Sequence, residues 1–534
     1  MSRTTISEHG DAHMRNGGQD GMEGDDTADS GGPGTGADPE TGAGAEDPAG
    51  RQESGLRRVL PWIAPVVAAG AGALLSVGAF LGVYVRPTSD DWCALWKARD
   101  LGVLGTTSDF YRTQNGRVTN AFLTGLLYSD GMRGPKLLPA FLILTLGVGL
   151  FLLAREVLRA LRLPFPVVAA VTAVLVVEAL LFLAGTRSYQ VLLWAPATIS
   201  HTLPGVIGVW AALSGVWAAR SQRPWARSVA VGSAVVLGAA VGTLSEPFVA
   251  MSGLFAATAG VLCLPRLRVT SDRFASTWCA AWCLGLVVGT VVLYTSPGAR
   301  WRRAQQPERP LSLEELGATL HDWSRIWETI GGQWAYAGAG AAGVLLGLAV
   351  ALTGRRPAPR AAGGPSRGTV LAIAVLPVPL IALGSLVTAY GLRGGYGAGG
   401  WTYARAWTSF LVPFLIALCG YGVWLGHRIG RRLGARSALA AAVAGVAGIV
   451  AVAGTAALVP PTRTLTTTTV ERSLAWDRQD ARIRAEAAAG RPVVTYRPLL
   501  VGGLAEPFFT NAYARDWVAQ CAARYYGVDR LGRP

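Results

Sequence analysis

The sequence predicts an all-α polytopic membrane protein with about eleven transmembrane helices. The 534-residue chain is 51% hydrophobic, and its apolar residues are gathered into blocks of roughly 17 to 25 residues, the length that crosses a bilayer as a helix. Its basic residues, almost all arginine, form short clusters between these blocks. The predicted spans are 59–85, 136–154, 164–184, 203–219, 228–245, 247–263, 275–295, 334–353, 369–391, 405–426 and 437–459.

The N-terminal segment, residues 1–55, is predicted to be a disordered cytoplasmic tail. It is rich in Gly, Asp, Glu and Pro and nearly free of large apolar residues, so it buries too little surface to offset the entropy of ordering the chain. No short apolar core follows a basic start. We therefore expect the run 59–85 to be an uncleaved membrane anchor and not a signal peptide.

The loops predict the orientation of the transmembrane domain, residues 56–459. If the tail is cytoplasmic, every second loop should be basic, and these loops read "AREVLRALRL", "RSQRPWARS", "PRLRVTSDR", "GRRPAPRAAGGPSRG" and "HRIGRRLGAR". The remaining loops hold most of the acidic residues and loop aromatics, and we expect them outside a cell membrane. The long outer loops are 86–135, 185–202, 296–333 and 392–404.

The C-terminal segment, residues 460–534, is predicted to be a small extracytoplasmic α/β domain. It reads as a polar linker, an amphipathic helix near 471–489, a short strand at 492–496 and a second helix within "NAYARDWVAQCAARYYGVDRL". About 75 residues are too few for much of a core. We therefore expect this segment to pack against the outer surface of the membrane domain.

Two adjacent acids, Asp90 and Asp91 in "TSDDW", follow the first predicted span on its outer side. A carboxylate at the depth of lipid phosphates can act as a general base or help to hold a divalent cation such as Mg²⁺ or Mn²⁺. The alternative is that the pair only begins a helix, because the same sequence suits an N-cap.

Glu246 in "LSEPF" is a second catalytic candidate, because it lies between two short apolar runs at the outer interface. Its alternative is a hairpin tip before Pro247. In "SPGARWRR", Arg300, Arg302 and Arg303 stand on the side that should be poor in basic residues. A guanidinium group binds phosphate through two parallel hydrogen bonds, so we expect these arginines to bind substrate. The alternative is that they are arginines whose charged ends reach the membrane interface.

Further substrate-binding candidates lie in the outer loops near aromatic residues. An aromatic ring with polar neighbours suits a sugar, although Trp and Tyr also form interfacial belts. These candidates are Arg117 in "NGRVTN", His201 in "WAPATISHTLPG", and Tyr403 and Arg405 in "YARAW".

Several classes of site are poorly supported by the sequence. It has no "GxxxxGK" phosphate loop, no dinucleotide fingerprint and no "HExxH", so we expect no nucleotide cofactor. The net charge of +15 comes without a stripe of basic and stacking aromatic residues, so we expect no nucleic-acid partner.

In the order of its motifs, the chain resembles a bacterial family of largely uncharacterised polytopic membrane proteins similar to GT-C glycosyltransferases. The motifs are "DDWCALW", "NGRVTNAFL", "WAPATISHTLPG", "LSEPF", "SPGARWRR" and "YARAW", and the resemblance covers roughly residues 55–530. It implies a multi-span transferase fold that uses a polyprenyl-phosphate sugar. By this resemblance Asp90 or Asp91 is the base or metal-organising acid, and Arg300 with its neighbours holds the donor phosphate. This chain has Ala299 where the family's turn has Asn.

The residues and the resemblance both point to a glycosyltransferase. It would move a sugar from a polyprenyl-phosphate donor to an envelope glycan, lipid or protein acceptor on the outer face. A transporter or flippase of lipid-linked sugars is the first alternative, and it would place its polar residues near the bilayer midplane on broken helices. A non-catalytic envelope protein is the second, and it would need none of these carboxylates.

Cysteine positions predict one disulfide. Cys263, Cys279, Cys283 and Cys419 fall within predicted spans, whereas Cys93 and Cys521 lie in outward segments, where disulfides form. We therefore expect a Cys93–Cys521 bridge that clamps the C-terminal segment over the site. The alternative is two unpaired thiols.

Overall fold

The computed structural model describes residues 48–221, 223–264, 273–305, 312–353, 374–434, 437–502, 506 and 510–534, with side chains from residue 62 onward. The predicted disordered tail therefore lies almost entirely outside the described residues. Its last residues, from Pro48, belong to the first helix. Residues 52–534 form one compact unit, which includes the C-terminal segment.

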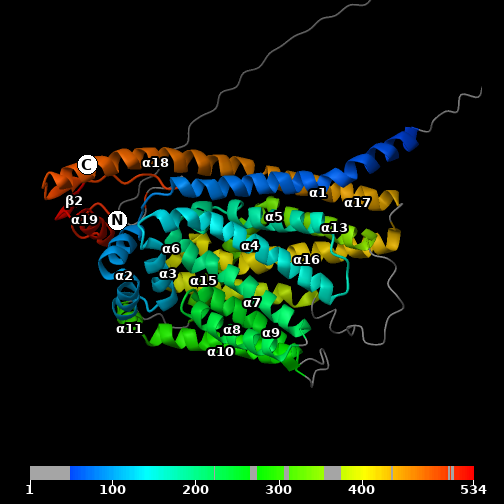
Figure 1. Cartoon of the computed structure of the whole chain (residues 1–534), viewed down its shortest axis with the longest axis horizontal. Helices are drawn as coiled ribbons and strands as arrows, with labels where there is room; N and C mark the ends of the chain where they lie inside the picture. Colours follow the sequence, from blue (N-terminus) through cyan, green and yellow to red (C-terminus); the bar gives the residue numbers. More distant parts are fainter. Residues whose placement is uncertain are drawn as a thin grey trace, which may run out of the picture. The chain divides into compact units, whose positions relative to one another are not determined.

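Each of the eleven predicted spans overlaps one helix of a bundle (Figure 1). Eight helical segments of the described chain are long and apolar enough to cross a membrane, so the protein is a helical multi-pass membrane protein. Helices α5, α9 and α15 are not among these eight, and α5 and α9 have only 17 residues each. The bundle helices are α1 (Pro48–Phe80), α4 (Arg133–Ala160), α5 (Val167–Leu183), α7 (Leu203–Arg220), α8 (Pro224–Gly242), α9 (Glu246–Leu262), α10 (Arg273–Thr295), α13 (Ala337–Thr353), α15 (Pro377–Tyr396), α16 (Thr408–Leu433) and α17 (Ala438–Ala456).

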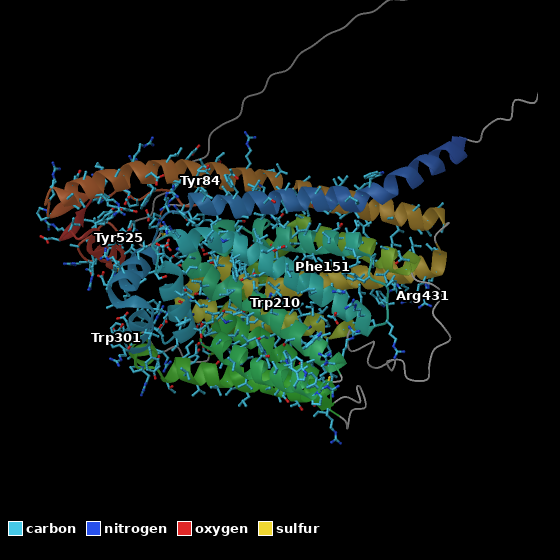
Figure 2. The ribbon with its side chains drawn as sticks, viewed as in Figure 1. Tyr84, Phe151, Trp210, Trp301, Arg431 and Tyr525 are labelled. Carbon is cyan, nitrogen blue, oxygen red and sulfur yellow. A yellow bond between two sulfur atoms is a disulfide. The ribbon has the colours of Figure 1, made fainter. Side chains whose placement is uncertain are left out.

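Further helices connect these spans, and several of them gather at one end of the bundle. Figure 2 shows Trp301 and Tyr525 at this end, called the α2 end below, and Arg431 at the opposite end. The connecting elements are η1 (Leu81–Tyr84), α2 (Asp91–Thr113), α3 (Val118–Tyr128), η2 (Tyr189–Leu193), α6 (Ala195–Ala197), η3 (Thr198–Thr202), α11 (Pro297–Ala304), α12 (Leu313–Gly332), η5 (Trp334–Tyr336), η6 (Gly397–Thr402) and η7 (Ala404–Trp407). The α2 end consists of α2, α3, α11 and the C-terminal helix α19 (Trp517–Tyr526).

Small residues hold the bundle helices close together. On α13, Gly343 and Gly347 face α16, and a Cβ at either position would overlap a backbone carbonyl of that helix. On α16, Gly422 and Gly426 face α13 in the same way. Spacing of small residues by four allows two helix backbones to approach closely in a bilayer, where packing replaces the hydrophobic effect.

The C-terminal segment differs from its prediction at its start. Residues 459–488 form one continuous helix, α18 (Val459–Ala488), so the predicted polar linker is wrong. Proline in the first helical turn gives up no intrahelical hydrogen bond, and Thr466 and Thr468 donate their hydroxyls to carbonyls four residues earlier. The threonine run is therefore compatible with a helix despite its polar composition.

A two-stranded parallel sheet completes this segment. Strand β1 (Val493–Thr495) lies within the predicted strand, and it pairs with β2 (Arg530–Gly532), which was not predicted. Val494 is opposite Leu531, and both are buried. Helix α19, inside the predicted second helix, connects the two strands and packs against α2.

Two turns meet at the α2 end and position the first residues after α2. Gly116, in the "QNG" turn, has φ of 71°, and a Cβ there would overlap the Oγ of Ser296 in the "SPG" turn. A Cβ on Gly298 would likewise overlap the backbone of Gln114. Both glycines are therefore required for the close contact between the two turns.

We predict that Gly116→Ala destabilises the protein more than Gly131→Ala does. Both glycines have positive φ, but a Cβ on Gly131 meets nothing within 4 Å. The control should cost about 1–2 kcal/mol for the left-handed backbone alone, and Gly116→Ala should add about 1–3 kcal/mol for the overlap. Thermal unfolding of both purified variants measures the difference, and equal losses would contradict this packing.

Candidate functional site

The candidate site is built around residues 86–91, which join η1 to α2. Ser89 is fully buried and has φ of 51°, a left-handed conformation that is rare for residues other than glycine. Its Oγ has no hydrogen-bond partner in the described part of the chain. Such backbone costs about 1–3 kcal/mol and persists only where the surroundings impose it. The turn sets the direction in which Asp90 and Asp91 leave the loop.

Asp91 is buried and its carboxylate is already engaged. One oxygen accepts a hydrogen bond from the Thr88 N–H at 2.9 Å, and the other accepts one from the Tyr128 hydroxyl. Burial raises the pKa of Asp91 to about 7, and the charge of Asp90 adds to this rise while the two hydrogen bonds oppose it. Asp91 therefore holds the loop to α3.

Asp90 is partly exposed and its carboxylate is not engaged. It lies at the N-cap position of α2 but makes no capping hydrogen bond, and no described residue donates a hydrogen bond to its side chain. Desolvation raises the pKa of Asp90 to about 6, against the opposing charges of Arg405 and Arg302. Of the two acids, Asp90 is the one available to a substrate.

Residues of the C-terminal segment bind the loop directly before Asp90. Arg472 of α18, 5% exposed, donates to the carbonyls of Arg86 at 3.2 Å and Pro87 at 2.7 Å. Its guanidinium also lies 3.8 Å from Glu506. Glu506 in turn accepts a hydrogen bond from the Thr88 hydroxyl at 3.0 Å. One buried charge pair thus fixes three consecutive loop residues.

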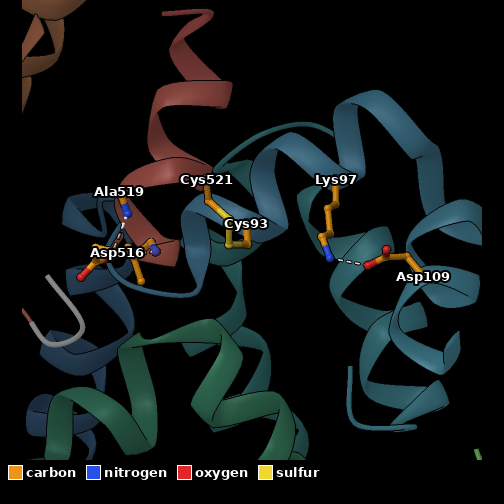
Figure 3. Close-up of a disulfide and its surroundings, with 7 residues drawn as sticks. Cys93, Lys97, Asp109, Asp516, Ala519 and Cys521 are labelled. Carbon is orange, nitrogen blue, oxygen red and sulfur yellow. Dashed lines mark hydrogen bonds and ion pairs between the residues drawn. A yellow bond between two sulfur atoms is a disulfide. The ribbon is translucent and has the colours of Figure 1, made fainter. Parts of the chain in front are cut away.

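A disulfide joins the same two regions, as Figure 3 shows. Cys93 of α2 and Cys521 of α19 are bonded, with their Cα atoms 4.9 Å apart and a sequence separation of 428. Asp516 caps α19 by accepting from the Val518 and Ala519 N–H groups.

Trp92, next to the paired acids, is fully buried against the C-terminal segment. Its ring lies among those of Trp476, Tyr496, Tyr525 and Tyr526, at centroid distances of 5.5–6.3 Å. The disulfide and this aromatic cluster together anchor the start of α2, directly after Asp90, to the C-terminal segment.

Glu246 lies at the start of α9 and is paired with the first loop. Its carboxylate accepts a hydrogen bond from Arg117 at 2.6 Å. Beside this pair, the hydroxyls of Thr119 and Thr243 are 2.6 Å apart. These contacts tie the start of α3 to the turn between α8 and α9, so Glu246 holds Arg117 in place.

The three α11 arginines, all exposed, have different surroundings. Arg302 is close enough to Asp90 to act on its carboxylate electrostatically. Arg303 donates to the Tyr294 carbonyl at 2.7 Å and lies over the Tyr294 ring. The Arg300 side chain makes no hydrogen bond or ion pair with another described residue. Of the three arginines, Arg302 is therefore the one whose charge acts on Asp90.

The charge of Arg405 also acts on Asp90, and Arg405 lines a cavity of about 730 Å³. Arg405 is 8% exposed, and its guanidinium donates to Gln190 at 3.2 Å and lies 5.3 Å from the Trp194 ring and 5.0 Å from the Tyr403 ring. Thr88, Arg187, Ser188 and Thr464 also line the cavity. Its walls come from the loop after α5, from η7, from α18 and from residues 501–502.

His201 connects the two groups of residues. It lies in η3, and it is close enough to both Arg117 and Arg405 to interact with them electrostatically. The structure thus brings together Asp90, Arg302, Arg405, Tyr403 and His201, with the Arg117–Glu246 pair beyond His201.

A protein-built metal site is not supported by the donor set. The described residues contain no cluster of three or more His, Cys, Asp or Glu side chains suited to a metal ion. Both oxygens of Asp91 already accept hydrogen bonds, which leaves Asp90 alone as a free carboxylate. We therefore derive no catalytic step through a metal.

Sequence patterns did not single out several residues of this site. Tyr128, Arg472 and Glu506 fix the acids, and Arg187 and Gln190 line the cavity, yet none belongs to a recognisable motif. The adjacency of Arg187 and Gln190 to "WAPATISHT" is the only local signal that points to them. Comparison with protein-family models, curated proteins and solved structures gives no match.

We predict that Arg472→Met destabilises the protein by about 3–5 kcal/mol, because it leaves the Glu506 charge and two loop carbonyls without their buried partner. Arg463→Met is the matched control, because Arg463 is exposed on the same helix and its side chain makes no hydrogen bond or ion pair with another described residue. Chemical or thermal unfolding compares the two. A similar small loss in both variants would show that Arg472 does not hold the loop.

Proposed function

We propose that the chain is a membrane glycosyltransferase that moves a sugar from a polyprenyl-phosphate donor to an envelope glycan, lipid or protein acceptor. The observation that carries this proposal is the Asp90 carboxylate, which accepts no hydrogen bond from a described residue and is acted on by the charges of Arg302 and Arg405. The cavity lined by Thr88 and Arg405 also has aromatic, amide and hydroxyl groups in its walls, side chains of the kind that orient a polar ligand in a pocket.

The proposal includes eleven spans in a GT-C-like arrangement, with α5, α9 and α15 crossing the membrane beside the other eight. With a cytoplasmic N-terminus, an odd number of spans places the α2 end and the C-terminal segment outside the cell membrane. The Cys93–Cys521 disulfide at that end supports this orientation, because disulfides persist in oxidising compartments. The basic loops at the other end agree with it, although two of them lie largely outside the described residues.

In the proposed reaction, Asp90 takes the proton of an acceptor hydroxyl while the oxygen of that hydroxyl bonds to the anomeric carbon of the donor sugar. The bond from that carbon to the phosphate oxygen breaks, and the electron pair leaves with the polyprenyl phosphate. Arg302 neutralises the departing phosphate, with Arg300 and Arg303 on the same helix. Asp91 and the Arg117–Glu246 pair position the loop and make no bond to substrate.

We predict that Asp90→Asn lowers sugar transfer by at least about 10²-fold, because general-base catalysis contributes 10²–10⁴-fold, and leaves thermal stability unchanged. Asp91→Asn should lower stability instead, since it changes a buried acceptor of two hydrogen bonds. Asp100→Asn, an acid of the same helix paired with Arg99, is the control. Full transfer by Asp90→Asn would remove Asp90 from the mechanism.

The pH dependence should follow the same carboxylate. A base acts in its ionised form, and the pKa of Asp90 is raised to about 6, so kcat/KM should fall as the pH is lowered through about 6 and level off above 7. A pH–rate profile from 5 to 8 on a polyprenyl-phosphate sugar measures this limb. A profile that is flat over this range would contradict the assignment.

A flippase of lipid-linked sugars is the second candidate. Its supporting observation is the break at Trp194, whose extended backbone separates η2 from α6, because transporters bind substrates at interrupted helices. Reconstituted vesicles separate the two functions. Transfer of the sugar on one face supports the transferase, whereas movement of the intact lipid across the bilayer without transfer supports the flippase.

A further inference from the structure

The cavity lined by Thr88 and Arg405 contains a buried arginine without an ion-pair partner among the described residues. Arg405 is 8% exposed, yet it forms no salt bridge with a carboxylate in the part of the chain that the structure describes. Its side chain donates a hydrogen bond to the neutral amide of Gln190, and the rings of Trp194 and Tyr403 lie against it. A buried positive charge without a carboxylate in direct contact is costly, so this site is suited to an anion.

Arg187 adds a second guanidinium to the same cavity. It lies in the loop after α5, and its side chain makes no hydrogen bond to another described residue. None of the described residues that line the cavity is acidic. Two arginines that face a space of about 730 Å³ without a carboxylate form a site for an oxyanion, because guanidinium binds carboxylate and phosphate through paired hydrogen bonds.

This site is separate from the arginines of α11. Arg302 and Arg405 come from different helices, and both act on the Asp90 carboxylate. In the proposed transfer the donor carries its charge on the phosphate, which the α11 arginines neutralise. In that reaction the second cluster is not needed for the donor phosphate and is available to the other substrate.

We infer that the cavity binds the acceptor and that the acceptor is a saccharide bearing an oxyanion, a carboxylate or a phosphate, held by Arg405 and Arg187. This inference rests on the proposed transferase function. The hydroxyls of Ser188, Thr464 and Thr88 line the remaining walls and suit the sugar hydroxyls. The volume lies within the range of about 300–1,000 Å³ that small-molecule pockets have.

Calorimetric titration of the full chain in lipid nanodiscs tests the inference with glucuronic acid, glucose 6-phosphate, glucose and inorganic phosphate. At least one charged sugar should bind, and glucose should bind at least about tenfold more weakly, the loss expected for a charge-assisted hydrogen bond. Arg187→Gln and Arg405→Lys should weaken the charged sugar by a similar factor. Arg515→Gln, an exposed arginine at the same end, should leave its binding unchanged.

Three results would overturn the inference. Glucose that binds as tightly as the charged sugars would remove the oxyanion requirement, and binding of inorganic phosphate without any saccharide would leave only a phosphate site. Loss of polyprenyl-phosphate binding in Arg187→Gln, with charged-sugar binding retained, would place the donor in the cavity. Asp90→Asn should keep saccharide binding while it loses transfer, so a failure of the transferase proposal is distinguishable from a failure of this one.

Discussion

The buried contact between Arg472 and the loop 86–91 is the interaction on which the candidate site depends. The guanidinium donates to two consecutive loop carbonyls and is balanced by Glu506, which also accepts from Thr88. A loop held at three successive residues can keep Ser89 in a left-handed conformation that would otherwise relax. The orientation of Asp90 is therefore determined by a helix that lies almost four hundred residues later in the chain.

The same contact explains why two adjacent acids have different properties. Asp91 is buried, and its two carboxylate oxygens accept hydrogen bonds from Thr88 and Tyr128. Asp90 is partly exposed, and the charges of two arginines act on its carboxylate. Desolvation alone would favour the neutral form of Asp90, and the arginine charges partly reverse that preference. The result is a carboxylate that titrates near neutral pH, the range in which a general base is effective.

The helical framework could be predicted because long apolar blocks have few alternatives in a bilayer. Prediction failed for α18, where a threonine-rich sequence suggested a linker, because intrahelical hydroxyl bonds and tertiary packing are not visible in composition. The Cys93–Cys521 pairing could be predicted because the other four cysteines lie within predicted spans, which leaves these two in outward segments. The roles of Asp90 and Asp91 could not be separated, because that difference depends on Tyr128 and Arg472, which come from distant segments.

Backbone hydrogen exchange tests most directly whether the C-terminal segment holds the loop before Asp90. The measurement compares amides 88–94 in the wild-type protein and in the Arg472→Met variant, with the amides of α13 and α16 as internal references. If the Arg472 contact imposes the loop conformation, the substitution should accelerate exchange at 88–94 and leave the two reference helices unchanged. Unchanged exchange at 88–94 in a folded Arg472→Met variant would contradict the account.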